Sequence, residues 1–350
     1  MRRGVLIGVA VLVAGLLAGT LIYSRSHGRL IYQGKPVNVW AKQAFSAGPK
    51  ESAEAIAALK AMGPRAVPDL IQLLQAKESV FNKVAWSLSK VGPPSWRRLV
   101  LRSVPIRSVA FPRITAALAL GVIGPDAKAA VPALAEALRG SDAALRLHAA
   151  EALASIGEAA VPELMAVLTD KNPEVRERAA WALGMIGPAA NGAVPALTAR
   201  LRDQQATVRE TTAHALSLIG SGALPALVHL IEHERGLTQR EAAKALVGIP
   251  HAWRAAAPAL RQMMRDEDPT SRRQAIETLS AIVARDSPTI SATTSALADP
   301  DVGVRLAAAK ALGQIGPRAK LAVPELTRLA EGNDPSVRAA AKEALARIGP

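Results

Sequence analysis

A four-residue phrase, an apolar residue followed by proline, any residue and leucine, recurs along the chain and strongly constrains its fold. From residue 131 onward its copies begin 30, 33, 30, 33 and 66 residues apart. Degenerate copies at Val100 and Ile290 divide the two longest intervals, so the period is 30 to 33 residues. Such self-similarity indicates an array of stacked supersecondary units. The clear copies begin at Val67, Val131, Val161, Val194, Leu224, Ala257 and Val323.

Each period predicts two helices. Residues 173–187 place apolar side chains, including Val175, Leu183 and Ile186, on one face of a helix of 3.6 residues per turn. The Gly187-Pro188 pair that follows predicts a glycine C-cap in the left-handed conformation. Residues 191–203 form the second helix, with proline in its first turn, where its missing N–H costs nothing. Neither helix buries its apolar face alone, so successive pairs must stack.

An acidic residue precedes an arginine by six positions in five periods. With this spacing the chain resembles the HEAT repeat family, close to its short bacterial and phycobilisome-lyase-like branch, over about residues 50–350. The resemblance implies an all-α fold, a right-handed α-solenoid of stacked HEAT-like helix pairs. It also implies that the acids and arginines form a hydrogen-bonded structural ladder. The pairs are Asp170 and Arg176, Asp203 and Arg209, Glu234 and Arg240, Asp266 and Arg272, and Asp299 and Arg305.

The N-terminus predicts a membrane anchor. Arg2 and Arg3 precede an uncharged apolar run, residues 4–23, whose 20 residues span about 30 Å as a helix and can cross a bilayer core. We expect an uncleaved transmembrane helix within residues 1–24, a cleaved signal sequence being the alternative. Basic residues on both sides of the run leave the orientation nearly undecided. A single pass through a bacterial inner membrane, with the solenoid periplasmic, is the expectation.

Residues 25–49 are expected to hold a linker and a capping helix, ahead of about nine and a half repeats in residues 50–350. The segment 36–45 places Val37, Trp40, Ala41 and Ala44 on one side of a short amphipathic helix that covers the first repeat. The last period stops after its first helix, which leaves its final interface without a dedicated cap. End-to-end self-association is therefore an expected property.

Composition limits the chemistry. There is no cysteine, so disulfides and thiolate metal sites are excluded. The net charge is +14, which permits contact with anionic partners. The ladder arginines are interpreted as structural, and the remaining basic residues of the second helices share no single register, so no continuous basic stripe is predicted. Candidate partner-binding residues are Trp86, Trp181, Arg200, Arg261 and Arg265.

Trp181 occupies a position that other repeats fill with polar residues. Aligned on the glycine that ends each first helix, the same position holds Glu151, His214, Lys310 and Glu343, and a second tryptophan at Trp86. We therefore expect Trp181 to lie on the surface, where it covers the neighbouring repeat or contacts a partner.

No catalytic or cofactor site is predicted. Deoxyhypusine hydroxylase, which is built from related repeats, needs paired His-Glu motifs for two irons, and this chain has one, at His233 and Glu234. His229 and His233 could share a helix face, but two histidines without a third ligand make a weak metal site. No HExxH motif, glycine-rich phosphate loop or nucleophile elbow is present.

These observations favour a membrane-anchored, non-catalytic scaffold that binds another protein, with no cofactor. Two alternatives stay open. One is a lyase-like or cofactor-handling protein of the phycobilin-lyase type, and the other is a cytoplasmic nucleic-acid binder. The predicted anchor disfavours the second alternative, because it separates the array from nucleic acid.

Overall fold

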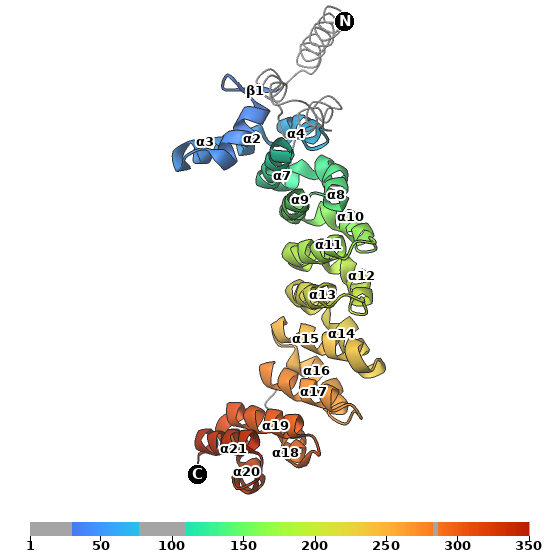
Figure 1. The fold of residues 1–350 in the computed structure, drawn as a ribbon, viewed down its shortest axis with the longest axis vertical. Helices are drawn as coiled ribbons and strands as arrows, with labels where there is room; N and C mark the ends of the chain where they lie inside the picture. Colours follow the sequence, from blue (N-terminus) through green and yellow to red (C-terminus); the bar gives the residue numbers. More distant parts are fainter. Residues whose placement is uncertain (1–29, 77–109, 283–285, 350) are drawn as a thin grey trace, which may run out of the picture. The chain divides into compact units, whose positions relative to one another are not determined.

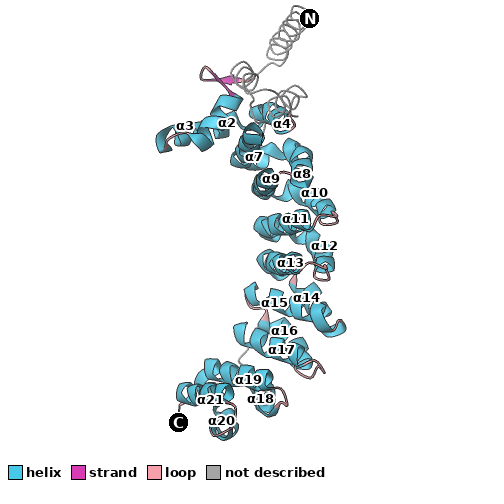
Figure 2. Cartoon of the chain, viewed as in Figure 1, coloured by secondary structure: helices cyan, strands magenta, loops and turns pink. Residues whose placement is uncertain are grey.

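The computed structural model describes residues 30–76, 110–282 and 286–349, and the chain divides into two compact units between Ala130 and Val131. Helices make up nearly all of the described chain, as Figure 2 shows, apart from one short hairpin near residue 33. The predicted helix pairs are therefore confirmed. The predicted anchor at residues 4–23, Trp86 and the degenerate repeat at Val100 lie outside the described residues.

The first unit begins with an antiparallel hairpin that leads into the capping helix. Helix α2 buries Val37, Trp40, Ala41 and Ala44, as the sequence predicted. The Trp40 Nε1–H donates to the Tyr32 carbonyl at 2.9 Å, and α2 packs against α3, α4 and α7. The elements are β1 (Ile31–Tyr32), β2 (Lys35–Pro36), α2 (Val37–Ser46), α3 (Pro49–Met62), η1 (Gly63–Ala66), α4 (Val67–Leu74), α7 (Ala110–Ile123) and η2 (Gly124–Ala130).

In the second unit, the first helices of successive repeats stack on one another. In Figure 1, α9, α11 and α13 form one column, beside a column of second helices that includes α10 and α12. The first helices are α9 (Ala143–Ile156), α11 (Pro173–Ile186), α13 (Ala206–Ile219), α15 (Gly236–Ala245), α17 (Pro269–Ala281), α19 (Val302–Ile315) and α21 (Pro335–Ile348). The second helices are α8 (Val131–Arg139), α10 (Val161–Val167), α12 (Val194–Arg200), α14 (Leu224–His233), α16 (Trp253–Met263), α18 (Ser287–Ser295) and α20 (Val323–Ala330).

The helices begin and end near the predicted proline and glycine residues, with one correction to the predicted geometry. Asn172 caps α11 by accepting from the Glu174 N–H, and Pro173 follows in the first turn. The glycine that ends α11 is not in the left-handed helical conformation, because Gly187 combines φ 69° with ψ −139°. Glycine is still required, since side chains disfavour positive φ. This geometry turns the chain directly into a 3₁₀ segment, η4 (Gly187–Ala193), so the α-helical part of the second helix starts at Val194.

Small residues bring neighbouring first helices close together. A Cβ added at Gly184 on α11 would lie 2.8 Å from the Cα of Ala215 on α13. Ala179, Ala182 and Leu183 are fully buried between the helices, whereas Ile186, predicted on the same face, is only half-buried. The core therefore consists of alanine and leucine packed at short interhelical distance.

The middle of the second unit is more polar. Four of the five buried polar side-chain atoms that have no hydrogen-bond partner among the described residues lie on α13 and α15. Burying a polar group without a partner costs roughly 1–3 kcal/mol, so each of these atoms reduces what the packing of its helix contributes to stability. The four atoms are Arg209 Nε, Thr212 Oγ1, Gln239 Oε1 and Glu241 Oε2.

One helical stretch of the described part, Phe111–Arg139, has the length and apolar composition of a membrane span. Just over half of its most apolar window is buried, 56%, and Ala127 within it is not helical. The stretch comprises α7, η2 and α8, which is typical of core helices in a repeat array.

Candidate functional site

The connections from second to first helices share one backbone turn. In every described connection of the second unit except the one at Glu234, the N–H of the residue at the ladder position donates to the carbonyl three residues earlier, as from Asp203 to Arg200 at 2.9 Å and from Asp299 to Ala296 at 3.2 Å. The aspartate carboxylate then accepts from the N–H two residues later, as Asp203 Oδ1 does from Gln205 at 3.0 Å. The acid therefore has a local role in shaping its own turn.

The spacing of six between acid and arginine has a direct structural cause. The Nη1 of Arg176 donates to the carbonyl of Asp170 at 2.8 Å and to that of Lys171 at 3.1 Å. The arginine thus binds the main chain of the turn, and the side chain six residues earlier is not required. Gly140 and Gly332 accept the equivalent bonds from Arg146 and Arg338 through their carbonyls.

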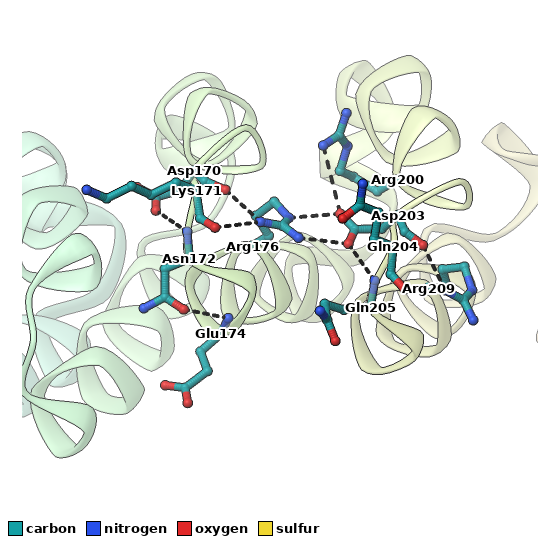
Figure 3. A network of polar contacts seen from close by, with 10 residues as sticks. All are labelled: Asp170, Lys171, Asn172, Glu174, Arg176, Arg200, Asp203, Gln204, Gln205 and Arg209. Carbon is teal, nitrogen blue, oxygen red and sulfur yellow. Dashed lines mark hydrogen bonds and ion pairs between the residues drawn. The ribbon is translucent and has the colours of Figure 1, made fainter.

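We call an arginine of one repeat that binds a carboxylate of the next repeat a rung. Two complete rungs join successive repeats. Arg176 donates from Nε to Asp203 Oδ2 at 2.8 Å and from Nη2 to Asp203 Oδ1 at 2.8 Å (Figure 3). Arg272 makes the same pair of bonds to Asp299 at 2.8 and 2.7 Å. In both rungs the partners lie 27 residues apart, and the side chain of Asp203 is 3% exposed. A planar guanidinium that donates two hydrogen bonds to one carboxylate fixes the relative orientation of the two side chains as well as the distance between them.

These contacts shift the pKa values of the partners. Burial by itself raises the pKa of Asp203, but the hydrogen bonds from Arg176 and from the Gln205 N–H outweigh it, and the pKa lies below its usual value. The same balance lowers the pKa of Asp299 beside Arg272. The hydrogen bond to Asp203 in turn raises the pKa of Arg176. Both rungs are therefore ion pairs at neutral pH.

Glu234 does not extend the ladder, which corrects the sequence expectation. Helix α14 continues to His233 and ends with a bond from the Glu234 N–H to the Leu230 carbonyl, four residues earlier, so the shared turn is absent. The Glu234 carboxylate instead accepts from Arg202. Arg209 still binds the carbonyls of Asp203 and Gln204, but its Nε is buried without a partner among the described residues.

In two further rungs the arginine contacts a residue two or four positions later than the predicted acid. Arg240 binds Asp268 at 2.5 Å instead of Asp266, and Asp266 lies 3.7 Å from Arg235. Arg240 therefore meets the following repeat two residues later than predicted.

The start of the ladder shows the same displacement. Asp170 lies 4.0 Å from Arg139, and Arg146 binds Glu174. The last predicted member, Arg305, binds the main chain of its own turn and has no carboxylate within ion-pair distance among the described residues.

A row of exposed apolar side chains lies near the C-terminal ends of successive first helices. Met185 on α11 and Leu218 on α13 are 56% and 40% exposed, and both stand two residues before the glycine that ends the helix. Val247, near the equivalent end of α15, is 49% exposed. Trp181 is half-buried and lies one helical turn before Met185, so the two share a face. We call these four residues the outer apolar row.

The basic candidates differ in their availability. Arg261 is held by Asp286 and Thr289, each at 3.1 Å, and Arg200 lies 3.9 Å from Asp203. A partner would have to displace these contacts. Arg265 is exposed and lines a cleft of about 700 Å³ beside the α16–α17 turn, together with Arg235 and Gln239.

Within the described ranges, no group of three or more histidine or acidic side chains is placed to hold a metal ion. His229 and His233 stack with ring centroids 4.2 Å apart, and His233 Nδ1 lies 2.9 Å from the His229 carbonyl. His148 pairs with Glu151 at 2.8 Å.

The sequence matches the HEAT repeats over residues 131–217, 161–246, 224–292 and 290–350, which together exceed half of the chain. The chain belongs to the HEAT repeat family. Residues 112–140 also match the PBS lyase HEAT-like repeat. No match was found among curated proteins.

Three of the solved structures that match this chain are the following. A crystal structure of an engineered protein is 26% identical, with a TM-score of 0.33, and the match covers 64% of this chain and 90% of that one. Kap95p in a complex with RanGDP is 12% identical with a TM-score of 0.49, and Kap95 in a complex with Nup1 is 13% identical with a TM-score of 0.47. Each match covers 89% of this chain, which spans 55% of each Kap95 chain.

Proposed function

We propose that this HEAT protein is a non-catalytic scaffold that binds another protein through the outer apolar row. The observation that carries the proposal is the exposure of Met185, Leu218 and Val247 in three successive repeats. Large apolar side chains that repeat along a surface are typical of protein-binding sites, because contact with a partner removes them from water. Trp181 adds an aromatic side chain of the kind enriched at interfaces.

The distribution of charge supports a protein partner over nucleic acid. Residues 131–350 carry 25 Lys or Arg and 24 Asp or Glu, whereas residues 1–130 carry 18 and 5. The repeat array of the second unit is therefore nearly neutral, and binding to phosphate backbones depends on clustered positive charge.

We further propose that residues 4–23 anchor the chain in a membrane, with the array outside the cytoplasm. The uncharged apolar run after Arg2 and Arg3 supports the anchor. Digestion of intact and permeabilised cells with protease tests the orientation. Cleavage of the array after the outer barrier alone is opened is the expected result, and complete protection until the inner membrane is lysed would overturn it.

An affinity pull-down from solubilised membranes tests the scaffold. Met185→Asp and Leu218→Asp should each lower recovery of the bound protein at least tenfold without unfolding the chain, because both side chains are already exposed. Ser155→Asp is the matched control, since Ser155 is exposed at the same helical position on α9. Recovery that is equal for all three variants would refute the role of the outer apolar row.

A further inference from the structure

The ladder contains an unfilled rung at Arg305, and we propose that it binds an aspartate carboxylate presented by a loop of the partner protein. The proposal rests on the scaffold function above and names the chemistry of one contact. It follows from a comparison of Arg305 with Arg272, the equivalent arginine one repeat earlier.

The two arginines are anchored in the same way. Arg272 Nη1 donates to the carbonyls of Asp266 and Glu267 at 3.0 and 2.9 Å. Arg305 Nη1 donates to those of Asp299 and Pro300 at 2.8 and 2.9 Å. A guanidinium is planar, and in Arg272 the edge opposite the anchored Nη1, formed by Nε and Nη2, faces Asp299 of the next repeat. Because Arg305 has the same main-chain anchor, we infer the same orientation for its Nε–Nη2 edge.

The two arginines differ in what they meet there. Asp299 stands 27 residues after Arg272 and fills its Nε–Nη2 edge, whereas the residue 27 positions after Arg305 is Gly332. Gly332 occupies the same backbone turn, because its N–H donates to the Leu329 carbonyl at 3.1 Å as that of Asp299 does to Ala296. The rung at Arg305 therefore lacks its carboxylate but retains the turn and the anchored arginine.

The vacated space is open to solvent. Arg305, Leu329, Gly332 and Asp334 contribute to a cleft of about 430 Å³ beside the start of α21. Arg305 is half-buried, so a ligand carboxylate would meet a partly desolvated guanidinium, where paired hydrogen bonds are strongest. Arg209 also has a glycine 27 positions later. Its Nε is buried, however, so a ligand carboxylate could not reach both donors of that edge.

Asp334 near the cleft does not prevent an anion from binding. Its carboxylate caps α21 by accepting from the Ser336 and Val337 N–H groups. The rung at Arg272 has the same arrangement, because Asp301 caps α19 two residues after Asp299. Arg272 nevertheless holds Asp299 with two hydrogen bonds beside that cap. An aspartate is favoured as the ligand because it is the residue that fills the equivalent rungs at Asp203 and Asp299.

The test uses the full chain labelled with [¹⁵N]arginine in detergent micelles and a C-terminally amidated peptide of residues 294–300, in which Asp299 is the one acidic side chain. The Arg305 Nε–H resonance, assigned with Arg305→Lys, should shift saturably as the peptide is added. The Arg272 resonance should not shift, because that edge is occupied. A peptide with Asp299→Asn should bind at least tenfold more weakly. An equal response to both peptides would overturn the proposal.

Gly332→Asp supplies an internal competitor without removing any contact. Gly332 does not have positive φ, and an added Cβ would lie 3.2 Å from the Leu329 carbonyl oxygen, so aspartate fits after a small adjustment. This variant should fill the rung and weaken peptide binding at least tenfold. Unchanged peptide binding in Gly332→Asp would refute the site. If inorganic phosphate saturates the Arg305 shift and the aspartate peptide does not, the site takes phosphate and the proposal is wrong.

The partner pull-down separates this inference from the scaffold proposal. A partner retained by the wild-type chain but lost from Gly332→Asp supports both. If both chains retain the partner equally, the scaffold proposal is supported, and the proposal that the partner's aspartate binds Arg305 is wrong. If the wild-type chain retains no partner, the scaffold proposal fails, and the aspartate-loop assignment falls with it even if the peptide binds.

Discussion

Arg176 grips the carboxylate of Asp203 with two hydrogen bonds of 2.8 Å, across 27 residues of sequence and the boundary between two repeats. Their side chains are 13% and 3% exposed. The contact therefore fixes the spacing of α11 and α13 from the turn side, while alanine and leucine fix it in the core.

Removing one partner of this rung should be costly. Asp203→Ala leaves the Arg176 guanidinium without its carboxylate and removes the bond that shapes the turn at Gln205. We expect a loss of about 2–4 kcal/mol in the free energy of unfolding, measured by urea denaturation. Glu234→Ala is the control, because its pair with Arg202 is more exposed and should contribute less than about 1 kcal/mol. Equal losses in the two variants would contradict a special role for the rung.

The rungs should make the stability depend on acid. Asp203 and Asp299 have pKa values below those of the unfolded chain, where aspartate titrates near about 3.9. Their contribution is complete above the unfolded pKa and is lost as the pH falls through the lower folded pKa. The difference in unfolding free energy between wild type and Asp203→Asn should therefore shrink from pH 7 to pH 3. A constant difference would show that the ionised form of Asp203 adds nothing.

Gly184 should tolerate no side chain. In Gly184→Ala the new methyl group would approach the Cα and Cβ of Ala215 to 2.8 and 2.9 Å, which forces α11 and α13 apart. We expect a loss of about 1–3 kcal/mol, read from the urea midpoint. Gly192→Ala offers a control within the following 3₁₀ segment, since no atom lies within 4 Å of the added Cβ. That variant should be neutral or slightly stabilising.

Trp181→Ala should cost less than about 2 kcal/mol, because the ring is half-buried and about 3–5 kcal/mol is typical of a core aromatic residue. Leu183→Ala, two residues later and fully buried, should cost about 2–5 kcal/mol. Thermal unfolding of both variants checks that Leu183→Ala loses more stability than Trp181→Ala. If Trp181→Ala keeps its stability but loses the partner in the pull-down, Trp181 contributes to binding; retained binding would exclude it from the interface.

Periodicity alone was sufficient to predict several local features. The face of α2 formed by Val37, Trp40 and Ala44 follows directly from helical spacing. The glycine that ends α11, Gly187, follows from turn chemistry, although its ψ differs from that of the predicted left-handed C-cap. The ladder was harder to predict, because spacing within one repeat reports where an arginine meets its own turn. It does not report which residue of the next repeat it faces.

Glu234 illustrates that limit. It stands six residues before Arg240, as Asp203 stands before Arg209, yet only Glu234 and Arg235 connect α14 to α15. The shortened connection removes the turn that presents the carboxylate. The unfilled rung at Arg305 was missed for the opposite reason, since a glycine at the acid position leaves the turn intact and appears in the sequence only as an absence.

Four buried polar atoms on α13 and α15 have no hydrogen-bond partner among the described residues, and we expect the contact between these helices to be weaker than a fully paired one. In a linear array each repeat is stabilised mainly by its neighbours. Two neighbouring repeats therefore unfold together only when the interface between them is strong. Repeats on either side of α13 and α15 should therefore melt as separate cooperative blocks, with amide hydrogens of these two helices exchanging first. A bound protein that contacts both blocks would merge the two melting steps into one.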